Sequence, residues 1–251
     1  MSTLIILIKL IAAHLIGDFI FQTDRLCRNK FSTKASTRWI SLAKHAMTQA
    51  ILTYIFIAQW GNWIVPLAVG LSHFCIDGIK ISLKRRSFKA FVIDQLFHYC
   101  VIFLIWWLYY VYGQQSVDVG QYLFSLKTWF ILTAFIAVLN PTSIFIKLFL
   151  EYENWTPEAT VYNGLPNAGK WIGFLERTLI LVFILTENIE GVGFLLAAKS
   201  IFRFGELNKT NDRIVTEYVL IGTLASFSIA ILLGYAALYI PDIVNEHLLQ
   251  G

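Results

Sequence analysis

Long apolar runs dominate the chain, and polar residues do not alternate regularly along them. A helix needs roughly 20 apolar residues to cross about 30 Å of hydrocarbon. Transmembrane β-strands would instead place a polar residue at every second position. The pattern therefore predicts spanning helices at about 3–22, 40–60, 63–83, 90–112, 121–139, 168–187 and 214–240, with a shorter eighth at about 190–204.

These runs predict an all-α fold, a polytopic transmembrane helix bundle of about seven to eight spans. We expect two halves, a four-helix half at residues 1–112 and a second half at 113–251. The second half contains a predicted cytoplasmic loop at about 140–167, in which 144–152 is expected to form a short interfacial helix. A composition of 57% hydrophobic and 14% charged residues agrees with a membrane bundle.

The basic residues indicate the orientation of the helices. They gather between the first two predicted spans and after the third, so the positive-inside rule places both loops in the cytoplasm. A multi-pass protein of the bacterial inner membrane is expected, with membrane lipids as partners. The net charge of +4 is small and is explained by this topology, so nucleic acid is not an expected partner.

Histidine and aspartate recur at one-turn spacing in the first hundred residues. His14 precedes Asp18, and His73 precedes Asp77, by four positions. Residues four apart lie on the same face of a helix, so each pair presents an imidazole and a carboxylate in one direction. A third pair, Asp94 with His98, has the same spacing in the reverse order.

The predicted topology places all of these residues, together with His45, toward the cytoplasmic ends of four helices. Ionisable side chains within a span are costly unless they are paired or hydrated. Convergence on one site is therefore the simplest arrangement.

Imidazole and carboxylate groups on facing helices are typical ligands of zinc, manganese or iron. The sequence predicts a divalent-metal site, with zinc the expected ion and manganese or iron as alternatives, held by His14, Asp18, His73, Asp77, Asp94 and His98. Residues that would orient these ligands or hold a water are Gln22, His45 and Gln95. A structural hydrogen-bond network and a proton relay stay open as alternatives.

The second half carries a separate set of charges. Glu176 and the cations Arg177, Lys199 and Arg203 are expected at similar depths, where opposite charges would neutralise one another. As an alternative, the three cations would bind a phosphate or a lipid headgroup.

Several motifs resemble a known bacterial membrane family, domain of unknown function 3307. They are HLIGDFIFQTD at 14–24, SHFCIDGIK at 72–80 and DQLFH at 94–98. Three blocks of the second half are similar to longer members: NAGKWIGFLERTLIL at 167–181, GFLLAAKSIFRFGEL at 193–207 and EYVLIGTLASF at 217–227. A weaker resemblance runs to inner-membrane metal-dependent hydrolases and to helical zinc phospholipases and nucleases. That resemblance implies attack of a metal-activated water on a phosphoester.

The function expected from this reasoning is a metal-dependent hydrolase for a lipid-linked or phosphate-containing substrate at the cytoplasmic leaflet. The metal would activate a water, and one of Asp18, Asp77 and Asp94 would take its proton. A transporter or ion- or proton-conducting protein is an alternative use of the same cluster. A scaffold or sensor for a cytoplasmic partner is another, and a homo-oligomer is also left open.

Overall fold

The computed structural model describes residues 2–83, 87–115, 117, 124–155, 167–204 and 213–249. Every element in this part of the chain is a helix, which confirms the all-α prediction. In chain order the elements are α1 Ser2–Ile16, η1 Gly17–Phe21, α2 Asp24–Lys30, α3 Ala35–Ile57, α4 Ile64–Ser82, α5 Phe88–Trp106, η2 Trp107–Tyr112, α6 Leu126–Val138, α7 Asn140–Tyr152, α8 Ala168–Leu185, α9 Ile189–Phe204 and α10 Arg213–Leu249. The two η elements are π-helical.

The chain divides into two compact units, Met1–Thr133 and Ala134–Gly251. The first contains all three predicted His–Asp pairs. The division after residue 112 that the apolar pattern predicts stays a prediction.

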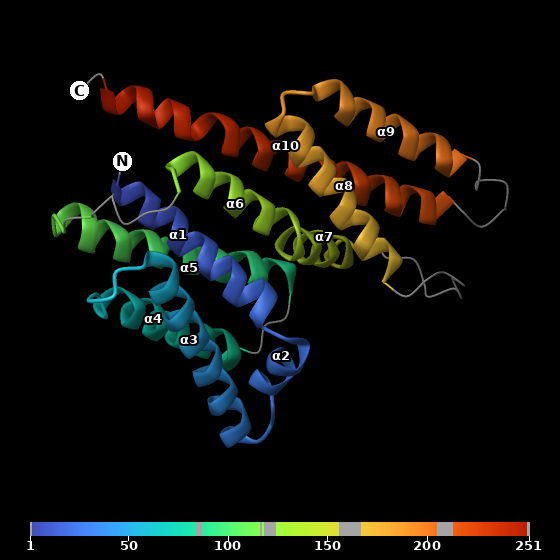
Figure 1. The fold of residues 1–251 in the computed structure, drawn as a ribbon. Helices are drawn as coiled ribbons and strands as arrows, with labels where there is room; N and C mark the ends of the chain where they lie inside the picture. The colour runs from blue at the N-terminus through green and yellow to red at the C-terminus, as the bar shows by residue number, and fades with distance from the viewer. Residues whose placement is uncertain are drawn as a thin grey trace. The chain divides into compact units, whose positions relative to one another are not determined.

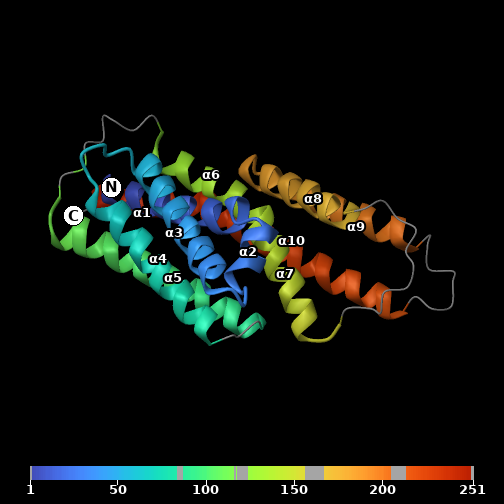
Figure 2. The ribbon, with the colours of Figure 1, turned by 90° about the horizontal axis from the view of Figure 1, so that it is seen from below.

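The first unit is built around four helices. α1 packs against α3 and α5, and α4 packs against the same two helices, so the four close into a ring (Figures 1 and 2). Gly70 lets α3 and α4 approach closely, since a Cβ there would lie 2.9 Å from the Cβ of Ala50. Side-chain caps at Thr23 and Ser87 fix the starts of α2 and α5.

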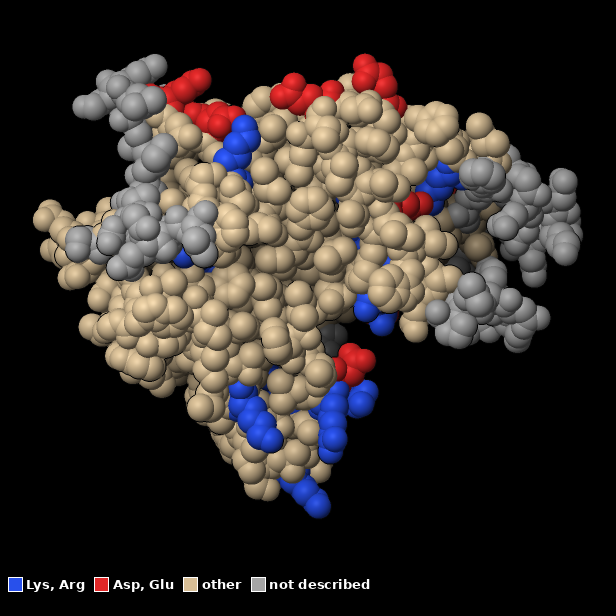
Figure 3. Space-filling view, viewed as in Figure 1, with Lys and Arg blue, Asp and Glu red and all other residues tan. Residues whose placement is uncertain are grey.

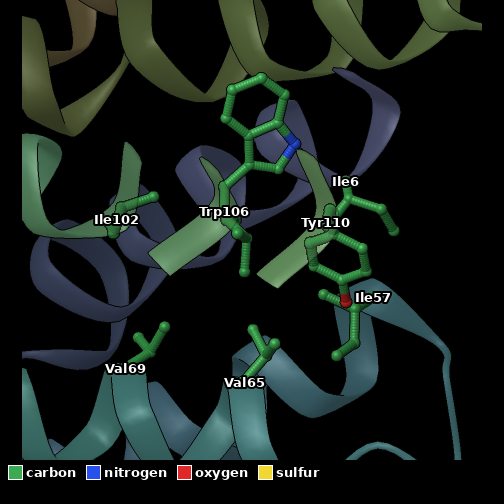
Figure 4. Close-up of a cluster of buried hydrophobic side chains, with 8 residues drawn as sticks. Ile6, Ile57, Val65, Val69, Ile102, Trp106 and Tyr110 are labelled. Carbon is green, nitrogen blue, oxygen red and sulfur yellow. The ribbon is translucent and has the colours of Figure 1, made fainter. Parts of the chain in front are cut away.

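The interior of this bundle is apolar toward one end (Figure 4). That end holds the start of α1, the end of α3, the start of α4 and the end of α5. Its buried cluster consists of Ile6, Leu10, Ile57, Val65, Val69, Ile102, Trp106 and Tyr110. The polar side chains described below lie on the same four helices toward their opposite ends.

Five helical segments of the described chain are long and apolar enough to cross a membrane: Thr3–Phe21, Ala35–Ile57, Ile64–Ser82, Phe88–Tyr112 and Val215–Glu246. A sixth span forms if Leu126–Val138 and Asn140–Tyr152, which meet at a 40° bend, are counted as one. These helices indicate a membrane protein, but the prediction of seven to eight spans is not confirmed. α6 has only 13 residues, α9 has 16, and α8 carries Lys170, Glu176 and Arg177 within 18 residues.

In the second unit, α10 packs against α7 and α8, and α8 also contacts α9. α7 occupies Asn140–Tyr152, so the first part of the predicted 140–167 loop is helical, including the 144–152 segment expected as a helix. Residues 156–166 of that loop lie outside the described part of the chain.

Basic side chains gather at one end of the first unit. The space-filling view shows Lys and Arg at the tip where Figure 1 places α2 and the start of α3 (Figure 3). Arg25, Arg28, Lys34 and Lys44 are exposed there, whereas Lys30 is buried. The polar ends of the four helices therefore lie at the basic end of the unit.

Candidate metal centre

Four histidines meet inside the bundle, each from a different helix. His14 comes from α1, His45 from α3, His73 from α4 and His98 from α5, and each is at most 2% exposed. Three aspartates accompany them: Asp18 on η1, Asp77 on α4 and Asp94 on α5. The structure thus brings together every His–Asp pair of the sequence, and His45 with them.

Asp18 is the centre of the hydrogen bonds in this cluster. Its Oδ1 accepts from Gln49 Nε2 at 2.6 Å and lies 3.0 Å from His73 Nε2. Its Oδ2 accepts from Gln95 Nε2 at 3.1 Å, and the Oε1 of Gln95 lies 3.2 Å from His14 Nε2. One carboxylate therefore connects side chains from all four helices.

Local backbone geometry places Asp18 in this position. It lies in the π-helical turn η1 that continues α1, and such turns recur at functional sites. The preceding Gly17 is buried, and a Cβ on it would overlap with the Gln49 amide. Because Gly17 has no side chain, the Gln49 amide can pass close to its backbone and reach the Asp18 carboxylate.

The other two carboxylates form ion pairs with lysines. Lys30 of α2 donates to Asp77 Oδ2, and both side chains are buried. Lys80 donates to Asp94 Oδ2 at 2.6 Å and is 29% exposed, so it connects the cluster to the surface. With its amide turned to satisfy both of its groups, Gln22 accepts from Lys30 Nζ at 2.8 Å.

The imidazoles lie close together. The rings of His73 and His98 are stacked with their centroids 3.9 Å apart. The His14 ring lies 5.2 Å from each of these two rings, and the His45 ring lies 5.2 Å from that of His73.

Several potential ligand atoms in this cluster lack a hydrogen-bond partner in the structure. They include Nε2 of His45, Nε2 of His98 and Oδ1 of Asp94. The Nδ1 atoms of His14, His45 and His98 and the Oε1 of Gln49 are also buried without a partner. His45 Nε2 lies 3.1 Å from Asp18 Oδ1, the oxygen that also contacts Gln49 and His73. A buried polar atom without a partner costs free energy, and a bound ion or water would remove that cost.

Among the residues that the structure describes, three groups of side chains could hold a metal ion, with ligand atoms within 4.8 Å of one another in each group. They are His14, His73 and His98; Asp18, His45 and His73; and Asp77, Asp94 and His98. Nitrogen and oxygen donors of this kind suit zinc, manganese or iron. The residues present therefore fit a divalent cation.

Sequence reasoning missed two members of the cluster. Gln49 is completely buried and lies one helical turn after His45, the same spacing as the His–Asp pairs. Lys30 belongs to a basic loop in the sequence, and its burial depends on how α2 packs against α3. Lys80 lies one helical turn after Asp77 on α4 but pairs with Asp94 of α5.

The cations of the second unit form contacts of their own. Arg177 is buried and donates to the backbone oxygens of Val138 and Leu139 and to the hydroxyls of Ser143 and Ser226. These contacts hold the bend between α6 and α7.

Lys199 donates to Glu176 at 2.5 Å, which is the mutual neutralisation that the sequence favours. The side chain of Arg203 lies outside the described residues. Binding of phosphate or headgroups by these three cations stays a prediction.

Comparison with protein families agrees with the motifs in the bundle. The model of the family described as "Protein of unknown function (DUF3307)" matches residues 6–131. The chain belongs to this DUF3307 family. The match runs from within α1 to within α6 and hence includes all of the histidines and aspartates above, while the similarity of the second half to longer members stays a prediction. No curated protein and no solved structure matches the chain.

Proposed function

We propose that this DUF3307 protein is a metal-dependent hydrolase of the bacterial inner membrane, acting on a lipid-linked or phosphate-containing substrate at the cytoplasmic leaflet. The observation that supports it is the buried meeting of four histidines and three aspartates, in which ligand atoms of His45, His98 and Asp94 lack partners.

The chemistry would use the cluster in a defined way. A bound divalent cation lowers the pKa of a water toward about 7 and polarises a phosphoryl oxygen. An aspartate not engaged by the ion would accept the proton of that water. Lys30, which pairs with Asp77, and Lys80, which pairs with Asp94, would stabilise negative charge on the phosphate.

The location at the cytoplasmic leaflet is supported by the distribution of charge. Exposed Arg25, Arg28, Lys34 and Lys44 surround the end of the bundle that carries the cluster. The positive-inside rule assigns such an end to the cytoplasm. Lys80, partly exposed, would meet a substrate headgroup that approaches from that side.

Proton or ion conduction is the second candidate, because hydrogen bonds link His14, Gln95, Asp18 and His73 in series. A conducting path must continue through the whole membrane. Toward the other end, however, the described bundle is filled by the apolar cluster around Ile6, Val65 and Trp106 (Figure 4). A polar cluster confined to one end of the bundle favours the enzyme.

Elemental analysis of the detergent-purified full-length protein tests the proposal. We expect near-stoichiometric zinc, manganese or iron in the wild type and its loss in a His73→Ala, Asp77→Ala double variant that still elutes as a folded peak. Thr53→Val, a buried change on α3 about two helical turns beyond His45, is the matched control and should retain the metal.

Activity is then measured as release of a labelled headgroup from phospholipid in mixed micelles, with bis(p-nitrophenyl) phosphate as a soluble comparison. A wild type that stays free of metal after incubation with Zn²⁺ and Mn²⁺ would overturn the proposal. Proton flux in proteoliposomes that disappears with Asp18→Asn would favour conduction instead.

A further inference from the structure

Two of the three potential ligand groups share no residue. One consists of Asp18, His45 and His73, and the other of Asp77, Asp94 and His98. Each contains at least one histidine and one carboxylate, which is a sufficient set for one ion with positions left for water or substrate. The third group shares His73 with the first and His98 with the second, and its other member is His14.

The two disjoint groups lie next to each other. His73 of the first is stacked on His98 of the second, with ring centroids 3.9 Å apart. Asp77 lies between them: its Oδ2 is 3.7 Å from His45 Nε2, and its Oδ1 is 3.8 Å from His98 Nε2. Asp77 therefore faces both ligand groups, and its Oδ2 also accepts from Lys30 Nζ.

We propose that the centre holds two divalent cations side by side, the first bound by Asp18, His45 and His73 and the second by Asp77, Asp94 and His98. This inference rests on the proposed function and specifies how the site would act. Paired ions roughly 3.5–4 Å apart stabilise both the attacking and the leaving oxygen of a phosphoryl transfer.

Each of the two groups contains buried atoms without a hydrogen-bond partner. His45 Nε2 belongs to the first group, and His98 Nε2 and Asp94 Oδ1 belong to the second. Each group therefore contains a buried potential ligand atom without a hydrogen-bond partner. Lys80 occupies only Oδ2 of Asp94, which leaves Oδ1 directed toward His98 Nε2 at 3.8 Å. The lysine and an ion can therefore share this carboxylate.

Charge points to the class of substrate. With neutral histidines, the cluster has a net charge of minus one, because three aspartates (Asp18, Asp77 and Asp94) are opposed by two lysines (Lys30 and Lys80). Two divalent cations would convert this to three net positive charges in a buried site. Such a site requires anionic ligands, so the substrate would carry a phosphate close to the scissile bond.

The test is manganese stoichiometry combined with electron paramagnetic resonance on the full-length protein in detergent. We expect two Mn²⁺ per wild-type chain, with the multiline signal of exchange-coupled ions. His45→Ala, from the first group, and Asp94→Asn, from the second, should each retain one Mn²⁺ and give the six-line signal of an isolated ion. Thr53→Val should bind two.

The outcomes separate this inference from the proposed function. A wild type that binds one ion would overturn the paired centre and leave the metal-dependent hydrolase standing. Two ions without exchange coupling would also overturn it, because the two groups would then not be adjacent. A wild type that binds no ion would overturn both. If one of the single-group variants does not fold, the other still reports whether a single ion remains.

Discussion

Lys30→Met is the substitution whose consequences follow most directly from the structure. Lys30 reaches from α2 into the bundle and donates to Asp77 Oδ2, with side chains 4% and 7% exposed. Removing one partner of a buried ion pair costs about 3–5 kcal/mol, because the remaining charge is left uncompensated. At roughly 2–4 °C per kcal/mol for a chain of this size, the metal-free variant should melt between about 6 and 20 °C lower.

The same substitution should strengthen metal binding. In the proposed centre the Lys30 ammonium lies beside a carboxylate that holds an ion, so the two positive charges repel each other. Two unit charges 4 Å apart at an effective dielectric constant of 20 interact by about 4 kcal/mol, and a longer separation reduces this. A gain of about 1.4–4 kcal/mol corresponds to roughly ten- to a thousandfold tighter binding.

The assay is thermal unfolding in detergent, with EDTA and with a series of Mn²⁺ concentrations. Lys30→Met should be less stable than wild type in EDTA and should gain more stability from Mn²⁺, because a ligand that binds the folded state stabilises it in proportion to its affinity. Lys147→Met, which removes a lysine with a 72% exposed side chain from α7, is the control and should change neither value. Equal stabilisation of Lys30→Met and wild type by Mn²⁺ would refute the reasoning.

Three further predictions concern other parts of the structure. Gly17→Ala should displace the Gln49 amide from Asp18 and lower metal content or affinity at least tenfold, measured by Mn²⁺ titration, while the equally buried Thr53→Val does not. Arg177→Met should lower the melting temperature, because the buried Val138 oxygen loses its donor at about 1–3 kcal/mol and the part-buried Leu139 oxygen loses a donor as well; an unchanged melting curve would contradict this role. Burial raises the pKa of the Cys27 thiol on α2, so its labelling by a water-soluble maleimide should be slower at pH 7 in the folded protein than in dodecyl sulfate and should keep increasing above pH 9.

Much of the cluster was predictable because helix geometry converts sequence spacing into direction. His73 and Asp77 lie one turn apart, so their common direction follows from the sequence alone. Their convergence with Asp94 and His98 required only the alternation of helices across the membrane, which the basic loops indicate. The bundle has this up-and-down arrangement, and its polar residues occupy one end.

The features that escaped prediction depend on tertiary packing. An apolar run does not reveal where a helix stops: residues 121–139 appear continuous, but the helix is α6, Leu126–Val138, and it meets α7 at a bend. The bend is stabilised by Arg177, whose partners come from distant positions in the sequence. Lys30 was assigned to a loop by its charge, and only the packing of α2 makes it a buried partner of Asp77.

The contrast between the two ends of the bundle is the strongest structural argument about function. Buried ionisable groups are costly in a membrane protein, and a bundle held together only for stability would use apolar side chains throughout, as this one does around Trp106. Four histidines, three aspartates and two lysines instead occupy the end that carries the basic surface. Their cost is reduced by mutual contacts but not removed, because His45 and His98 keep nitrogen atoms without partners. A ligand that satisfies those atoms would explain why the helices carry these residues at all, and a cation is the ligand that imidazole nitrogens and carboxylate oxygens bind in common.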